Sequence, residues 1–301
     1  MVDGDAGRDL TGSTIVITGA SAGIGAAAAR RLSGLGANVI AIGRCRERTL
    51  AVAAEFGATP VVADFAHLDQ VRADSQQILA RCPSIDVLVN NAGGIVPRRT
   101  ITEDGYEATF QINHLAGFLL THLLLNRLQE TARTRDVRVI ATSSFANRFA
   151  RIRVDDLQPA RHRYGNGWTT YCATKLMNIM FTTELARRTA GTGLRAVCFH
   201  PDPGPDAEPS AANSPDAVPT NFARETVAMR AFHRIPRLRD TQLTGARGSQ
   251  PLIRLIRAPD VVNGAYYNGP RLSTAVNRQA KKPALAAELW EQSVQLLAPW
   301  L

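Results

Sequence analysis

The stretch STIVITGASAGIGAAAARRLSGLG, residues 13–36, decides the fold. A short β-branched run ends in a turn with glycines at 19, 23 and 25, and an Ala-, Leu- and Arg-rich helix follows, closed by Gly36. A helix N-terminus offers unpaired N–H groups and a positive dipole end, and glycine lets a pyrophosphate approach them. A glycine triplet alone also suits an ordinary turn, but its place between a strand and a helix indicates a dinucleotide site.

The rest of the chain repeats this alternation of strand and helix. Helical patterns run through 46–57, 68–82, 112–129 and 170–188, and further apolar strand candidates cover 37–44, 58–65, 85–93, 137–144 and 194–201. Strands separated by helices need crossover connections, so the sequence predicts an α/β fold with a doubly wound, mostly parallel, Rossmann-type sheet. We expect one domain over 1–301, with a polar tail at 1–12 and a substrate loop or lid at 202–250.

Composition narrows the classes of partner. The net charge is +9, but the arginines are scattered without a basic tract, so we expect no nucleic-acid binding. The longest apolar stretch, Leu115 to Leu125, is too short to cross a bilayer, and the N-terminus resembles neither a signal peptide nor an anchor. The four cysteines lie far apart, which predicts free thiols and no metal site. A cytoplasmic protein that acts on a small molecule is therefore expected.

The end of the second strand distinguishes the two nicotinamide dinucleotides. A carboxylate there would bind the ribose hydroxyls of NAD, whereas Arg44 in AIGRCR favours the 2′-phosphate of NADP, unless it is an ordinary surface arginine. Asp64, followed by Phe65 at the end of the third strand, could accept from the adenine amino group or could cap the next helix. We assign cofactor binding here to these loop and strand-end residues: Gly19, Ser21, Gly23, Ile24, Gly25, Arg44, Asp64 and Phe65.

Lys175 stands out because only Lys281 and Lys282 are also lysines among the 35 basic residues. Tyr171 lies four residues before it, so the two side chains share one face of a helix. A free phenol has a pKa of about 10, and an ammonium within about 4–6 Å lowers it. We therefore expect Lys175 to lower the pKa of Tyr171. Ser144, 27 residues before Tyr171, adds a hydroxyl at the end of another strand.

The motifs TGASAGIG, NNAG, INHLAGF, SS and YCATK, in this order, resemble those of the short-chain dehydrogenase/reductase family. The sequences of 112–128 and 171–188 are closest to the retinol-dehydrogenase-like branch of that family. The resemblance implies that Tyr171 is the general acid in carbonyl reduction and that Ser144, rather than Ser143, binds the substrate oxygen. It implies that Lys175 also holds the nicotinamide ribose and that Asn113 holds a water. It places four further residues at the nicotinamide: Asn91, Ala92, Gly93 and Pro201. Pairing into a homodimer through the helices near 106–128 and 169–188 is a further possibility.

Two regions depart from the family pattern. The family commonly has Pro-Gly after the sixth strand, but this chain has HPDPG at 200–204, which puts the usual nicotinamide contacts in doubt. In the basic segment beyond it, five apolar residues could line a substrate pocket: Phe222, Val227, Met229, Phe232 and Ile235. Four arginines there could meet an acidic substrate or form a solvated face: Arg230, Arg234, Arg237 and Arg239. The insert at 145–170 could bring four aromatic residues to the pocket mouth: Phe145, Phe149, Tyr164 and Trp168.

These features predict an NADPH-dependent reductase of a ketone or aldehyde, with a bulky aromatic, polyketide-like or lipophilic carbonyl as substrate. An NAD-preferring alcohol dehydrogenase of the same fold is one alternative. A sensor that binds NADP without turnover is another, although this chain keeps both Tyr171 and Lys175.

Overall fold

One eight-stranded sheet organises the chain in the computed structural model, which describes residues 7–158, 164–202 and 245–301. The strand order is β3-β2-β1-β4-β5-β6-β7-β8; all neighbours are parallel except β7 and β8. The strands are β1 (Thr14–Thr18), β2 (Asn38–Gly43), β3 (Thr59–Val62), β4 (Val87–Asn90), β5 (Val137–Thr142), β6 (Leu194–His200), β7 (Tyr266–Asn268) and β8 (Arg271–Leu272). The order reverses between β1 and β4, the place where such sheets bind ligands at their carboxyl edge.

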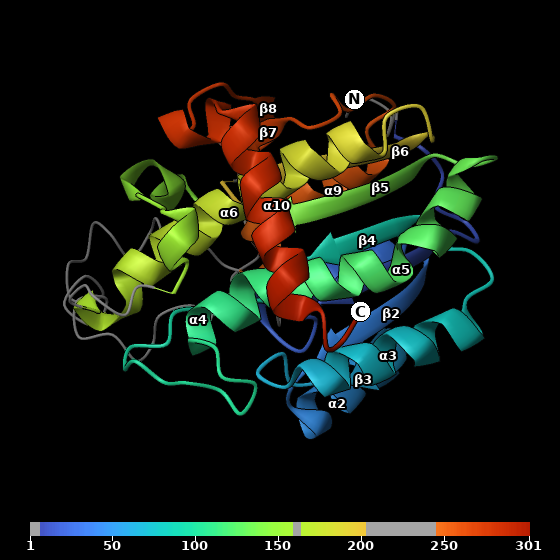
Figure 1. Cartoon of the computed structure of the whole chain (residues 1–301). Coiled ribbons are helices and arrows are strands. Elements are labelled where there is room, and N and C mark those ends of the chain that lie inside the picture. Colours follow the sequence, from blue (N-terminus) through green and yellow to red (C-terminus); the bar gives the residue numbers. More distant parts are fainter. Residues whose placement is uncertain (1–6, 159–163, 203–244) are drawn as a thin grey trace, which may run out of the picture.

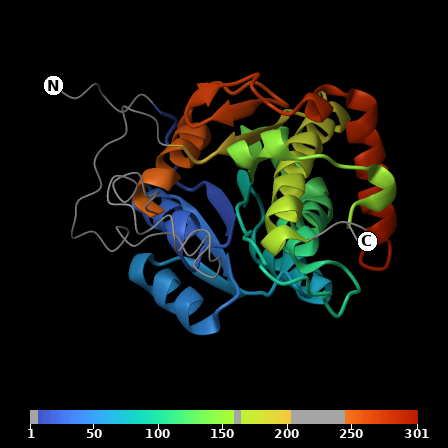
Figure 2. The ribbon, with the colours of Figure 1, turned by 90° about the vertical axis from the view of Figure 1, so that its left-hand side faces the viewer.

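Helices cover both faces of the sheet (Figures 1 and 2), as the alternating pattern predicted. One face carries α1 (Gly23–Ser33), α2 (Arg46–Phe56) and α9 (Gly245–Arg257); the other carries α3 (Leu68–Arg81), α5 (Ala116–Ala132) and α6 (Trp168–Arg188). Burial on both sides explains why the central strands are continuous apolar runs; every residue of β1 and β5 is buried. Shorter helical segments are α4 (Ala108–Phe110), a π-helical turn (Gln111–Leu115) and 3₁₀ turns at Phe145–Phe149, Val154–Asp156, Gly165–Gly167 and Arg278–Lys281.

Two strands beyond the predicted six extend the sheet at its β6 edge. In β7, Tyr266 pairs with Cys198 and Asn268 with His200, and β8 returns as a hairpin strand. Three and two residues are too few to show a hydrophobic period, so the sequence alone did not reveal them. Their pairing brings the C-terminal part of the chain to the carboxyl edge of the sheet.

Helix α10 (Pro283–Leu297) forms an outer layer over α5 and α6, and Figure 2 shows it outermost on that side. Trp290 anchors it: its ring lies 4.6 Å from that of Phe118 and stacks on Phe181 at 5.8 Å, centroid to centroid. The guanidinium of Arg188 lies 4.8 Å from the Trp290 ring, and the Tyr106 hydroxyl donates to the carbonyl of Leu296. Helix α10 thus packs on part of the surface that α5 and α6 form, and homodimer pairing through these helices stays a prediction.

The expected N-terminal tail and substrate loop are described only in part. Residues 7–12 pack on the domain, because Leu10 is buried and the Arg8 backbone N–H donates to the carbonyl of Arg257. Residues 245–250 belong to α9, whose Gly245 packs on the carbonyl of Gly23. The proposed pocket and anion residues from Phe222 to Arg239 lie outside the described residues. The four cysteines are free, and no helix in the described ranges is long and apolar enough to span a membrane.

Candidate active site

Thr18, at the end of β1, joins the glycine loop to the end of β4. Its hydroxyl accepts from the backbone N–H groups of Asn91 and Ala92, both at 2.9 Å, and the Asn91 amide donates back to the Thr18 carbonyl. The approach leaves no room for a side chain at Gly19, whose added Cβ would lie 2.9 Å from Ala92 Cα. At Gly25 it would lie 2.3 Å from the Gly19 carbonyl oxygen. Sequence reasoning missed Thr18, although a hydroxyl residue directly before the first glycine was a visible signal.

The start of α1 suits a phosphate group. Ala22 occupies the N-cap position, and its side chain cannot accept a hydrogen bond. The backbone N–H groups of the first turn of α1 are therefore not capped by a side chain. Ser21 packs against Gly43, where an added Cβ would lie 2.7 Å from the Ser21 Cβ. Gly23 adopts a positive φ of 57°, and Ile24 is half-buried beside it. The residues present therefore fit the pyrophosphate of a dinucleotide.

Arg44 and Asp64 follow the ends of β2 and β3. The Arg44 side chain is exposed. It forms no hydrogen bond or ion pair with any of the described residues (7–158, 164–202 and 245–301). The Asp64 carboxylate accepts from the N–H of Ala66 at 3.0 Å. Its alternative role as a helix cap is wrong, because α3 begins at Leu68 with His67 in the N-cap position. Phe65 is buried, and its carbonyl accepts from the Gln111 amide.

The fold brings Ser144 and Tyr171 together in the interior. Both are buried, and their side chains share a hydrogen bond. The rival, Ser143, instead donates its hydroxyl to the carbonyl of Lys175 at 2.7 Å. Ser144 is therefore the serine that lies at the phenol, and Ser143 fixes the helix that carries the phenol. Trp168 stacks on Tyr171 with ring centroids 5.8 Å apart.

Lys175 lies beneath the same phenol. Its Nζ is 5.4 Å from the Tyr171 ring centroid and donates to the carbonyl of Thr142 at 3.1 Å. Burial lowers the pKa of Lys175 to about 8. Burial also raises the pKa of Tyr171, against the opposing hydrogen bond of Ser144. The expected lowering of the Tyr171 pKa by the ammonium is therefore not found, since desolvation of the phenolate is the larger effect.

Asn113 lies in the π-helical turn between α4 and α5. Its Oδ1 accepts from the N–H of Gly94 and its Nδ2 donates to the carbonyl of Gly94, both at 2.9 Å, while Nδ2 also reaches Thr174 Oγ1 at 3.1 Å. A Cβ added to Gly93 would lie 2.9 Å from Asn113 Oδ1 and 3.4 Å from Lys175 Nζ. The π-helical turn thus places Asn113 in contact with Gly93 and Gly94, close to Lys175. Such turns are frequent at functional sites.

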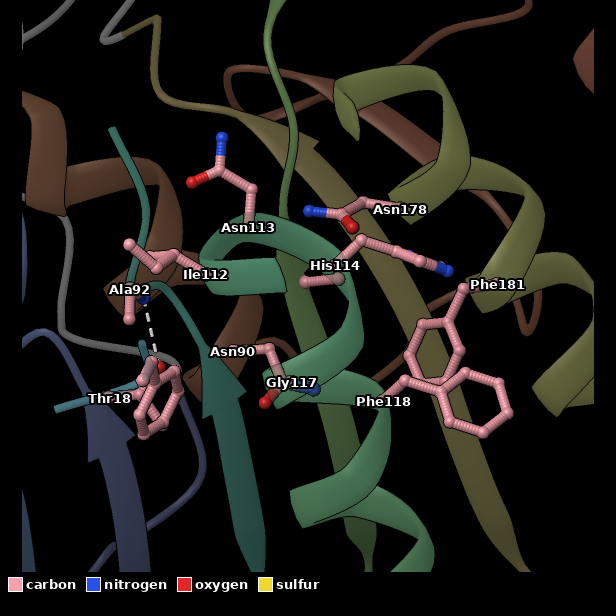
Figure 3. Close-up of a pocket in the computed structure, with 12 residues that line it drawn as sticks. Thr18, Asn90, Ala92, Ile112, Asn113, His114, Gly117, Phe118, Asn178 and Phe181 are labelled. Carbon is pink, nitrogen blue, oxygen red and sulfur yellow. Dashed lines mark hydrogen bonds between the residues drawn. The ribbon is translucent and has the colours of Figure 1, made fainter. Parts of the chain in front are cut away.

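A buried polar chain behind Lys175 was not anticipated. The Asn178 amide donates to the same Thr142 carbonyl at 3.2 Å, and His114 is hydrogen bonded to Asn178. The Nε2 of His114 lies 3.0 Å from the hydroxyl of Ser293 on α10. Figure 3 shows His114 and Asn178 side by side at a small cavity of about 10 Å³. The signals were present: an asparagine three residues after Lys175 and a histidine directly after Asn113.

A second, larger pocket of about 290 Å³ opens at the ends of β6 and β7. It is lined by Phe145, Arg148, His200, Asp202, Tyr266, Asn268, Ser273 and Ala275. Phe145 is thus at the pocket as expected, with Phe149 next to it, their ring centroids 6.2 Å apart. Tyr164 is not at this pocket: its hydroxyl lies 2.7 Å from both the Glu107 carboxylate and the Val96 carbonyl.

Known proteins share both sequence and fold with this chain. Residues 13–155 match the family model described as short chain dehydrogenase. A Streptomyces sp. (strain C5) protein with the provisional name daunorubicin C-13 ketoreductase DnrU is 42% identical over 94% of this chain and 92% of its own length. Human retinol dehydrogenase 14 is 35% identical over 96% and 87%. A crystal structure of an uncharacterized Mycobacterium paratuberculosis protein aligns with TM-score 0.74 and 30% identity over 97% and 96%.

The sequence identities and the lengths aligned are high enough to assign the chain to a family. Members of this family bind a nicotinamide cofactor. The two relatives are named as oxidoreductases, and their alignments with this chain cover nearly their whole length. The chain belongs to the short-chain dehydrogenase/reductase family, in its retinol-dehydrogenase-like branch, and is an oxidoreductase.

Proposed function

We propose that the protein reduces a bulky aromatic, polyketide-like ketone to an alcohol with NADPH. The observation that carries this proposal is the buried convergence of Ser144 and Lys175 on the phenol of Tyr171. The name of the DnrU relative supports ketone reduction, and the exposed aromatic residues near the site support an aromatic substrate. Phe145 is 49% exposed, Phe149 68% and Trp168 42%.

A nicotinamide cofactor, when bound, would supply the hydride. Ser144 would donate a hydrogen bond to the substrate carbonyl oxygen, and Tyr171 would give that oxygen its proton as negative charge builds there. Because burial raises the pKa of Tyr171, the phenol keeps its proton at neutral pH, which favours the reducing direction. Lys175 would hold the nicotinamide ribose and, with Asn113, return a proton to Tyr171.

The cofactor would lie along the carboxyl edge of β1, β2 and β4. The pyrophosphate would meet the uncapped start of α1, and the 2′-phosphate would meet the exposed Arg44. Asp64 would face the adenine, beside Phe65. The remaining contacts are assigned to Gly19, Ser21, Gly23, Ile24, Gly25, Asn91, Ala92, Gly93 and Pro201.

Steady-state kinetics with NADPH and NADH tests the cofactor assignment. Arg44→Ala should raise the KM for NADPH at least tenfold and leave that for NADH nearly unchanged, because only NADPH carries the 2′-phosphate. Arg31→Ala, which removes an exposed arginine near the opposite end of α1, is the matched control and should change neither. If wild type prefers NADH, the NAD-dependent alternative replaces this part of the proposal.

A panel of aromatic and aliphatic ketones, followed by NADPH oxidation, tests the reaction. Tyr171→Phe should abolish turnover while NADPH binding, measured by fluorescence, stays within about twofold of wild type. Turnover within a few-fold of wild type would exclude Tyr171 as the acid. NADPH binding by a wild-type protein that reduces no member of the panel would favour the sensor alternative.

A further inference from the structure

The 290 Å³ pocket lies beside the catalytic residues but is built by different parts of the chain. His200 ends β6 and pairs in register with Asn268 of β7, while Phe145 and Arg148 come from the 3₁₀ turn after β5. Ser273 follows the β8 strand on the far wall. The pocket therefore depends on the β7–β8 extension of the sheet.

One chain connection and two contacts link this pocket to the reaction centre. Phe145 directly follows Ser144, and the Ser143 N–H donates to the carbonyl of Phe199, which fixes the end of β5 against the end of β6. Tyr266 lies close enough to Tyr171 to add to the rise of its pKa. A substrate whose carbonyl meets Tyr171 can therefore extend a second portion into the pocket.

The pocket offers hydrogen-bonding groups for an uncharged polar substituent. The Nδ1 of His200 is buried and has no hydrogen-bond partner within the described ranges. Burial lowers the pKa of His200 to about 4, so its imidazole is neutral at pH 7 and can donate or accept one hydrogen bond. The imidazole ring lines the pocket, but its Nδ1 has almost no accessible surface, so a ligand hydroxyl bonds this nitrogen only when the ring turns toward the pocket.

Asp202 and Arg148 add an acceptor and donors to the lining. The Asp202 backbone is fixed, because its N–H donates to the His200 carbonyl at 2.8 Å and the Gly269 N–H donates to the same oxygen at 3.0 Å. Arg148 Nε donates to the carbonyl of Ala275 at 3.1 Å, and the side chain lines the pocket. An acceptor, a donor and a neutral imidazole in one pocket match hydroxyl groups better than a charged group.

The apolar part of the lining indicates a flat ring. The Phe145 ring packs edge-on against that of His200 with centroids 5.6 Å apart, and Phe145 is half exposed. The pocket volume is near the lower limit of about 300–1,000 Å³ for whole ligand sites, so it suits one portion of a larger molecule. We propose that the pocket lined by Phe145, His200 and Asp202 binds a hydroxylated aromatic ring remote from the reacting carbonyl. This inference rests on the proposed function, because it places the ketone at Tyr171.

The test compares 6-acetyl-2-naphthol with 2-acetylnaphthalene, which lacks only the distal hydroxyl. Wild type should reduce the naphthol with a kcat/KM about tenfold higher, in line with one hydrogen bond to a charged or buried partner. Asp202→Ala and His200→Phe should each remove most of that preference. Both should leave kcat/KM for 2-acetylnaphthalene within about twofold. Arg151→Ala, at an exposed arginine outside the pocket, should leave the preference intact.

Binding of the naphthol to the protein saturated with NADP⁺, measured by calorimetry, separates this inference from the proposed function. Binding that weakens about tenfold in Asp202→Ala supports the subsite even if wild type turns over neither ketone, and in that case only the proposed function fails. Equal loss for both ketones, or no change in either variant, overturns the subsite while ketone reduction stands.

Discussion

The side chains of Lys175 and Asn178, three residues apart on α6, donate to one acceptor, the carbonyl oxygen of Thr142 at the end of β5. Asn178 is in turn hydrogen bonded to His114, whose ring stacks on Phe110 and is anchored to Ser293 of α10. The Thr142 carbonyl, which accepts from Lys175, is therefore also bound by Asn178. Through His114 and Ser293, this hydrogen-bonded chain extends to helix α10.

Asn178→Leu should lower kcat about tenfold to a hundredfold, because loss of the amide frees the Thr142 carbonyl and lets the Lys175 ammonium shift. Leucine has the same number of heavy atoms and the same branching as asparagine, so we expect a folded protein with NADPH affinity close to that of wild type. Steady-state kinetics and fluorescence titration check the two quantities. Asn178→Gln, which can restore the amide, should recover part of kcat; an equal fall in both variants with unchanged pH dependence would point to packing alone.

Lys175→Met should raise thermal stability while it abolishes turnover. The pKa of Lys175 is lowered by burial from its ordinary 10.5 to about 8, so at pH 7 the folded state carries the charge at a cost of roughly 3 kcal/mol. That cost is full below pH 8 and shrinks as the pH rises from 8 to 10.5, because the native lysine is then neutral while the unfolded one is still charged. Calorimetry should show the difference in Tm between variant and wild type narrowing over that interval. A lower Tm for the variant at pH 7 would contradict the prediction.

Gly93→Ala should reduce activity at least tenfold. The new methyl group would meet Asn113 Oδ1 at 2.9 Å and Lys175 Nζ at 3.4 Å, so one or both of these side chains must move. Gly34→Ala is the matched control, because its added Cβ has no contact closer than 3.5 Å and its φ of −63° suits alanine. The comparison needs kcat and a thermal melt for each variant; normal kcat in Gly93→Ala would show that the site tolerates the displacement.

Trp290→Ala should destabilise the protein by about 3–5 kcal/mol, the usual cost of removing a buried tryptophan, and lower the Tm by roughly 10 °C. The indole is buried and packs on both Phe118 and Phe181, so its removal detaches α10 from α5 and α6. Trp300→Ala, at a half-buried residue with its ring 6.3 Å from that of Tyr106, should cost clearly less. Equal Tm values for the two variants would mean that α10 contributes little to stability.

Local patterns in the sequence determined the framework of this protein. The β-branched runs, the glycine turn after β1 and the helical periods gave six strands of the parallel sheet and the helices α1, α2, α3, α5 and α6. These features depend on near neighbours along the chain, which is why they are readable without a structure. The pairing of Tyr171 with Lys175 was readable for the same reason, because residues four apart share one helix face.

Tertiary structure decided what depends on burial and on distant segments. It selected Ser144 over Ser143, because only the packing of β5 against α6 sends one hydroxyl to Tyr171 and the other to a backbone carbonyl. It reversed the expected shift of the Tyr171 pKa, since desolvation depends on the whole environment of the phenol rather than on one charge. It also placed α10 over α5 and α6 and brought Tyr266 of β7 to the 290 Å³ pocket, because such contacts between residues far apart in the chain leave no periodic trace in the sequence.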